Sequence, residues 1–134
     1  MIQIWCIWRV MKKIIDWRLP IRLVSEANNT DHWTKKRKRF RAQKDWITMR
    51  HRLDGSPEIP LDCIVVVTRI APRELDEDNM YSCCKHLRDY IADLIRPGLA
   101  PGRADDSKTI EWNYKQEKGQ PKEYAVKIEV FVQD

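Results

Sequence analysis

The segment from Arg73 to Asn79 holds the side chains best suited to chemistry in this chain of 134 residues. Its aspartates Asp76 and Asp78 are two positions apart, so both carboxylates point to one side if the chain is extended there. Two close carboxylates repel each other unless one is protonated or a cation lies between them. Because oxygen ligands suit hard divalent cations, the pair predicts a site for Mg²⁺, with Mn²⁺ as an alternative.

A second acidic pair, Asp105 and Asp106, ends a long loop rich in proline and glycine. Marked loops of this kind are more often functional than decorative. We therefore expect this pair to meet Asp76 and Asp78 at one metal site. A plainer interpretation stays open for each: Asp78 is then only a helix N-cap, Asp76 a solvated turn residue, and the second pair part of an ordinary loop.

Hydrophobic periodicity indicates the elements that must position these acids. Period-two patterns and short aliphatic runs predict strands over 14–24, 61–70, 109–116 and 124–132, and longer patterns predict helices over 32–53 and 79–95. The continuous run Ile64–Val67 indicates burial on both faces, hence a central strand. We expect the last two strands to pair as a C-terminal hairpin. The predicted fold is a small single-domain α+β fold, with two helices packed on a mixed sheet in the order β-α-β-α-β-β.

The two predicted helices differ in character. The first has a thin apolar face, formed by Trp33, Phe40, Trp46, Ile47 and Met49, and Thr30 or Asp31 as its expected N-cap. The second has a regular inner stripe and Asp78 or Asn79 as its expected N-cap. Lys85 and Asp89 lie within about 20° of the direction of Asp78 on its surface. This flank is either part of the site or an ordinary i, i+4 ion pair.

The first helix carries six basic residues within seven positions: Lys35, Lys36, Arg37, Lys38, Arg39 and Arg41. This density covers all sides of a helix. It favours a clamp on phosphate backbones, and it also fits a nuclear-import or heparin-type patch or a merely solvated helix. Arg69 and Arg73 are further candidates for DNA contact. The net charge of +5 is compatible with a polyanionic partner but does not identify one.

The remaining composition limits the class of protein. The four cysteines form no CxxC pair, so a zinc site is not expected, and reduced thiols indicate a cytoplasmic protein. The apolar residues 1–10 lack the features of a signal peptide and are too short to span a membrane. We interpret residues 1–13 as an N-terminal extension to a domain over 14–134, with an added edge strand as the alternative for 1–10.

The order of these motifs resembles the RusA family, phage- and prophage-associated endonucleases that resolve Holliday junctions. The resemblance covers roughly residues 14–133 and rests on the D-x-D-N element Asp76–Asn79, the following helix with its lysine, and Asp105–Asp106 before the closing strands. The opening strand and the loop with Asn28 are also similar. By resemblance Asp76, Asp78 and Asp106 are the metal-site aspartates, with Asp105 beside them. The chain departs from the family at Ser82, where a lysine is usual; Lys85 is the nearest substitute.

The resemblance implies an enzyme that hydrolyses phosphodiester bonds of four-way DNA junctions with Mg²⁺, acting as a homodimer in the cytoplasm of a bacterial host, without an organic cofactor or a membrane partner. Lys85 would stabilise the attacked phosphate or the leaving oxygen. Two other functions stay open. One is a non-catalytic DNA-binding protein on the same fold, and the other, more remote, is an RNA-binding phage accessory protein.

Overall fold

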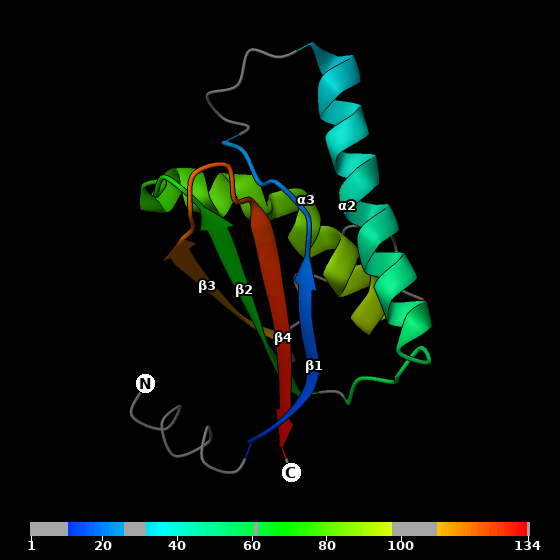
Figure 1. Cartoon of the computed structure of the whole chain (residues 1–134). Helices are drawn as coiled ribbons and strands as arrows, with labels where there is room; N and C mark the ends of the chain where they lie inside the picture. Colours follow the sequence, from blue (N-terminus) through cyan, green and yellow to red (C-terminus); the bar gives the residue numbers. More distant parts are fainter. Residues whose placement is uncertain (1–10, 26–31, 61, 98–109, 134) are drawn as a thin grey trace.

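The computed structural model describes residues 11–25, 32–60, 62–97 and 110–133, which form four strands and two helices (Figure 1). The α+β class and the order of the elements are as predicted. In chain order they are β1 (Met11–Leu19), α2 (Trp33–Leu53), β2 (Cys63–Ala71), α3 (Glu77–Ile95), β3 (Ile110–Lys118) and β4 (Ala125–Gln133).

The strands form one mixed sheet in the order β1-β4-β2-β3. β2 is parallel to β3 and antiparallel to β4, and β4 is antiparallel to β1. The predicted C-terminal hairpin is therefore wrong, because β2 lies between β3 and β4. The physical reason is that every residue of β2 is buried, so this strand requires a neighbour on each side.

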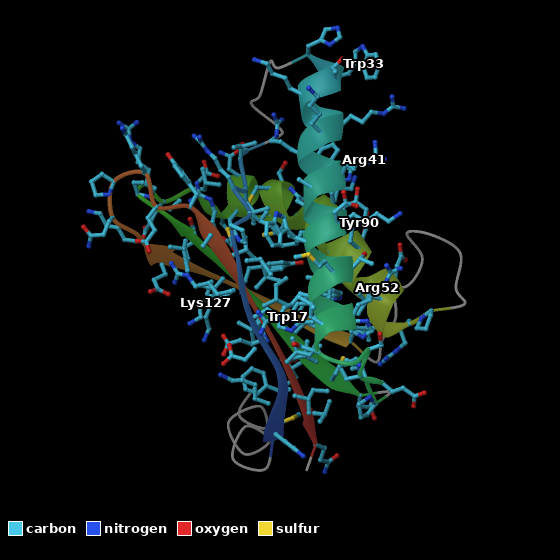
Figure 2. The ribbon with its side chains drawn as sticks, turned by 45° about the vertical axis from the view of Figure 1, so that its right-hand side comes forward. Trp17, Trp33, Arg41, Arg52, Tyr90 and Lys127 are labelled. Atoms are coloured by element: carbon cyan, nitrogen blue, oxygen red, sulfur yellow. The ribbon has the colours of Figure 1, made fainter. Side chains whose placement is uncertain are left out.

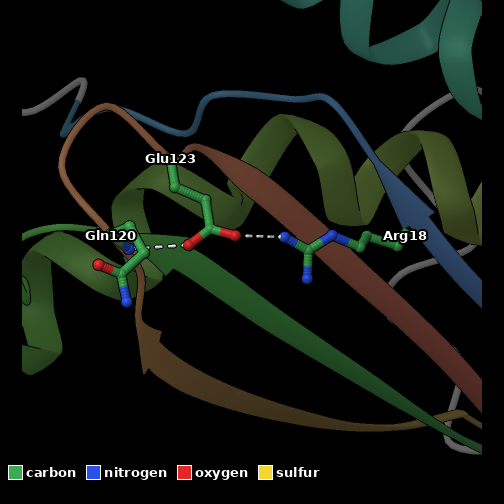
Figure 3. A network of polar contacts seen from close by, with 3 residues as sticks. All are labelled: Arg18, Gln120 and Glu123. Atoms are coloured by element: carbon green, nitrogen blue, oxygen red, sulfur yellow. Dashed lines mark hydrogen bonds and ion pairs between the residues drawn. The ribbon is translucent and has the colours of Figure 1, made fainter.

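The connection from β3 to β4 passes the end of β2, and Gly119 makes this passage possible. Its backbone N–H donates to the Ala71 carbonyl oxygen at 2.9 Å. A Cβ on Gly119 would lie 2.9 Å from a carboxylate oxygen of Glu123 and 3.2 Å from the Ile70 side chain. That carboxylate accepts a hydrogen bond from the Gln120 backbone N–H and pairs with Arg18 of β1, each at 2.8 Å (Figure 3). The turn is thus tied to β1 and β2.

β1 begins earlier and ends earlier than predicted. Residues 11–13, which the expected extension included, instead pair with β4. Pro20 ends the strand because it has no N–H to donate to a ladder. Ile21 and Leu23 nevertheless stay buried, as the odd-position pattern predicted. Residues 1–10 lie outside the described residues.

Both helices contribute to one hydrophobic cluster with one face of the sheet. The cluster joins Ile47 of α2 and Leu87 and Ile91 of α3 to Val65 and Ile128 of the sheet. Phe40 of α2 stacks on His86 of α3 with ring centroids 3.7 Å apart. The helices therefore cover the same face, packed against each other.

The predicted inner face of α2 is only partly right. Ile47 and Gln43 are its buried residues, whereas Trp33 and Met49 are 61% and 44% exposed. Trp33 is exposed because the first half of α2 projects past the core. Met49 is exposed because it lies about 160° around the helix from the buried Ile47. The N-cap is His32 rather than Thr30 or Asp31: the Thr34 backbone N–H donates to His32 Nδ1 at 3.3 Å.

The three cysteines in the described part of the chain are buried. Cys63, Cys83 and Cys84 are free, and burial raises the pKa of the Cys63 thiol. The pKa of Cys84 is raised by its hydrogen bond with Cys83 and by burial. Within the described ranges, no helix is long and apolar enough to cross a bilayer.

Candidate metal site at the start of helix α3

Asp76 is the N-cap of α3, where Asp78 or Asn79 was expected. Its Oδ1 accepts a hydrogen bond from the Asn79 backbone N–H at 2.8 Å, and its Oδ2 accepts one from Asn79 Nδ2 at 3.0 Å. Asp76 has extended backbone angles, with φ −67° and ψ 170°, as N-caps usually do. The D-x-D-N element therefore starts the helix two residues earlier than its apolar stripe suggested, so Asp78 is helical rather than extended.

Asp78 and Lys85 share one exposed flank of α3. Both side chains are exposed, and Ser82, the position of the usual family lysine, is half-buried. Seven residues of helix separate Asp78 from Lys85 by about 10 Å along the axis and about 20° around it. The flank lies roughly opposite the buried stripe that contains Met80, Cys84 and Leu87, so it faces solvent. The predicted alignment of Asp78 and Lys85 is thus present on an accessible surface.

Arg69 ties the start of the acidic segment to the chain that follows β1, and its side chain is buried. It is 7% exposed; its Nε donates to the Leu23 carbonyl at 3.2 Å, and its Nη1 donates to the Arg73 carbonyl at 2.7 Å. The expected role of Arg69 in DNA contact is therefore wrong, because its guanidinium is used inside the fold. Arg73 is exposed and keeps that expected role.

Gln116 of β3 fixes the same segment from the other side, and sequence reasoning missed it. The Leu75 backbone N–H donates to Gln116 Oε1 at 2.8 Å, and Gln116 Nε2 donates to the Leu75 carbonyl at 2.7 Å. The side-chain amide thus pairs with the backbone in the manner of a neighbouring strand. The sequence does contain an indication of this role. Gln116 follows Trp112 and Tyr114 at two-residue spacing, so its polar side chain lies on the same face of β3 as these two aromatic rings.

A cleft of about 490 Å³ lies between the beginning of α3 and β3. Its lining combines two carboxylates, two side-chain amides, three aromatic rings and one methionine. These residues are Glu74, Glu77, Met80, Tyr81, Trp112, Asn113, Tyr114 and Gln116. Tyr81 and Tyr114 meet edge to face, with centroids 5.9 Å apart. Together with Asp76 and Asp78, the two glutamates give this end of α3 four carboxylates within five residues, where the helix dipole favours negative charge.

Arg88 braces the aromatic wall of the cleft. Its Nη1 donates to the Tyr114 hydroxyl at 3.1 Å, and its guanidinium lies 5.0 Å from the centre of the Trp112 ring. Burial raises the pKa of Tyr114, so its hydroxyl stays protonated at neutral pH. The rings of Tyr114 and Trp112 therefore form an uncharged aromatic surface beside the acidic segment, and the Arg88 cation holds them in place.

Two carboxylates at the start of α3 keep the capacity to accept further ligands. A carboxylate offers about four lone-pair sites, and Asp76 uses one on each oxygen for Asn79, so both oxygens keep accepting capacity. Asp78, two residues after Asp76 in the sequence, is also exposed. Mg²⁺ usually takes one or two protein carboxylates and several waters. Among the described residues, however, no three acidic, histidine or cysteine side chains gather into a metal-binding group.

Asp105 and Asp106 lie outside the described residues. β3 begins at Ile110, paired with Cys63, whereas Gln116 and Leu75 meet near the opposite end of β3.

The basic run lies on the first half of α2, which extends beyond the sheet (Figure 1). Lys35, Arg37, Lys38 and Arg41 are exposed, and Lys36 and Arg39 are half-buried. The run therefore offers charges on several sides of a projecting helix, as expected. Comparisons of this chain with models of protein families, with curated proteins and with solved structures found no match.

Proposed function

We propose that this chain is a divalent-metal-dependent endonuclease that resolves four-way junctions and other branched DNA by hydrolysis of phosphodiester bonds. One observation carries the proposal. Asp76 and Asp78 lie at the end of a segment whose backbone is held by Arg69 on one side and Gln116 on the other. Metal ligands work when surrounding residues fix their positions in advance, and these two partly buried clamps hold the backbone just before Asp76.

Asp76 and Asp78 would hold Mg²⁺ or Mn²⁺, and Asp106 with Asp105 would complete the ligands. The bound metal would lower the pKa of a water molecule and neutralise charge on the phosphate. Lys85, on the same exposed flank as Asp78, would stabilise the attacked phosphate or the leaving oxygen. Gln116 and Arg69 act on this chemistry only by positioning the acidic segment.

Branched DNA is the proposed partner because the cations lie on a projecting helix. The exposed side chains of α2 would contact phosphates, which gives affinity for DNA shape more than for sequence. Arg73 would add a contact next to the acids. A homodimer would place two sites against opposite strands of a junction. The corresponding setting is the cytoplasm of a bacterial host, with a phage or prophage as the source of the gene.

A second function is favoured by one specific observation. Both oxygens of Asp76 already accept hydrogen bonds from Asn79, which is a sufficient structural role for this residue. A protein that binds branched DNA without cutting it would need the cap and the basic helix but no metal. Such a protein would bind junctions equally well with chelator or with Asp78 replaced.

Cleavage of a labelled synthetic four-way junction, beside a linear duplex of the same length, separates these functions. The assay compares Mg²⁺, Mn²⁺ and chelator for the wild type and Asp78→Asn. Paired, symmetric cuts in the junction that disappear with chelator and with the variant are the expected result. Tight binding without cuts, equal in both proteins, would reject the nuclease and leave the DNA-binding protein.

A further inference from the structure

The tip of α2 carries an exposed tryptophan beside the basic run. Trp33 is 61% exposed, whereas Trp17 is 2% exposed and Trp46 is half-buried against the core. Figure 2 shows Trp33 at the end of the helix that projects past the sheet. A tryptophan ring combines a large apolar area with a polar N–H group, so an exposed tryptophan beside cations is a candidate contact for a ligand.

Two neighbours orient the Trp33 ring. The Arg37 guanidinium lies 5.2 Å from the ring centre, one helical turn away. The His32 ring lies 5.5 Å from it at an angle of 38°, and His32 is itself held as the N-cap by the Thr34 N–H. A ring fixed in this way loses little side-chain entropy when it binds, which favours affinity.

Three cationic side chains follow the Trp33 ring along the same face of α2. Trp33, Arg37 and Arg41 follow one another at four-residue spacing, and Lys44 lies on the same side, so all four fall within about 80° of one helix face. All four are exposed, and Figure 2 labels Trp33 and Arg41 on this helix. One flat apolar surface followed by a row of positive charges matches one unpaired base followed by the phosphates of its strand.

We propose that Trp33 stacks on an unpaired base of single-stranded or branched DNA, while Arg37, Arg41 and Lys44 contact the adjoining phosphates. The inference rests on the proposed binding of DNA and adds a preference for unpaired bases. An acidic chain without aromatic residues, such as poly-glutamate, would satisfy the cations but offers no π surface for the ring. A fully paired duplex likewise hides its base faces, so it would use only the charges.

The test is the anisotropy of fluorescent oligonucleotides titrated at fixed salt, with chelator present so that cutting cannot occur. The probes are a single-stranded DNA, its duplex and a four-way junction with an unpaired centre. We expect Trp33→Ala to weaken single-strand and junction binding by about 5- to 150-fold, the equivalent of roughly 1–3 kcal/mol per stacked base, and to change duplex binding little. Trp33→Phe should recover most of the loss.

Two control variants complete the design. Leu53→Ala removes an apolar side chain that is 74% exposed at the other end of the same helix and should change no affinity. Arg41→Ala should lower all three affinities and reduce the slope of log K against log salt by about 0.7–0.9, whereas Trp33→Ala should leave that slope unchanged. Trp33 is at the surface, so circular dichroism and melting temperature should not change with its replacement.

An equal loss on single strand and duplex, or no loss with Trp33→Ala, would overturn the stacking role. Binding to poly-glutamate that falls equally with Trp33→Ala would also overturn it, in favour of an acidic protein partner. These outcomes are independent of catalysis: a protein that stacks bases but never cuts fails as a nuclease and keeps this inference. A junction nuclease unaffected by Trp33→Ala keeps the proposed function and loses the inference.

Discussion

The side-chain amide of Gln116 forms two hydrogen bonds with the backbone of Leu75, one from the Leu75 N–H at 2.8 Å and one to the Leu75 carbonyl at 2.7 Å. Through this pair, strand β3 fixes the residue that directly precedes Asp76. The position of the candidate metal ligands therefore depends on a residue forty positions further along the chain.

Replacing Gln116 should disturb both stability and the proposed activity. Gln116→Leu leaves the Leu75 N–H and carbonyl without their partners, which should cost about 1–3 kcal/mol in urea unfolding. Gln116→Glu keeps the acceptor for the N–H but sets an oxygen against the Leu75 carbonyl, so it should also destabilise. Junction cleavage, measured where the variants are folded, should fall. Wild-type stability in Gln116→Leu would show that the amide pair contributes nothing.

Arg69 should behave as a structural residue rather than as a DNA contact. Arg69→Met removes its hydrogen bonds to Leu23 and Arg73, at a cost of about 2–3 kcal/mol. The matched variant Arg73→Met, at an exposed position, should change the free energy of unfolding by less than about 0.5 kcal/mol and instead weaken DNA binding. Equal stability of the two variants would contradict the assignment.

The turn that carries the chain from β3 to β4 should be sensitive to acid through Glu123. The hydrogen bond from the Gln120 N–H and the nearby Arg18 lower the pKa of Glu123 below its ordinary value of 4.5 (Figure 3). The folded protein therefore favours the carboxylate, so this stabilisation is complete above the ordinary pKa and is lost as pH falls through the folded value.

Chemical unfolding of the wild type and Glu123→Gln across pH measures this contribution. The wild type should be more stable near neutral pH, and the difference should shrink as the pH falls below the ordinary glutamate value of 4.5 and through the lower folded pKa. Arg18→Gln is the control, since it should reduce the difference without removing the Gln120 contact. A difference that does not change from pH 7 to pH 3 would show that the Glu123 charge has no role.

The elements could be predicted from the sequence because each has a strong local pattern. The aliphatic run of β2, the alternation in β4 and the apolar stripe of α3 identify their structures within a few residues. The pairing of the strands could not be predicted in the same way. β3 and β4 follow each other and both alternate, which suggests a hairpin, but β2 needs two neighbours and takes the place between them.

The candidate site was predicted only where its residues are local. Asp76, Asp78 and Lys85 share a short stretch of chain, and the helical position of Lys85 was predicted correctly; Asp78 was expected in an extended segment but lies in the first turn of α3, and Asp76 is its N-cap. The two clamps join residues that are distant in sequence, and a lone arginine or glutamine gives no sign of its partner. Arg69 was therefore assigned to DNA and Gln116 was overlooked. Trp33 was assigned to the core because its spacing fits the apolar face of α2, yet that end of the helix projects past the core.

Asp76→Asn tests the central claim most directly, because it separates the two roles of Asp76. Asparagine caps helices about as well as aspartate, but its NH2 group cannot accept the hydrogen bond from Asn79 Nδ2, so the variant should stay folded and lose about 1 kcal/mol of stability. It removes the negative charge that would hold Mg²⁺. The account predicts a folded protein with normal junction binding and loss of Mg²⁺-dependent cleavage. Wild-type cleavage by the folded Asp76→Asn protein would contradict it and leave Asp76 as a helix cap alone.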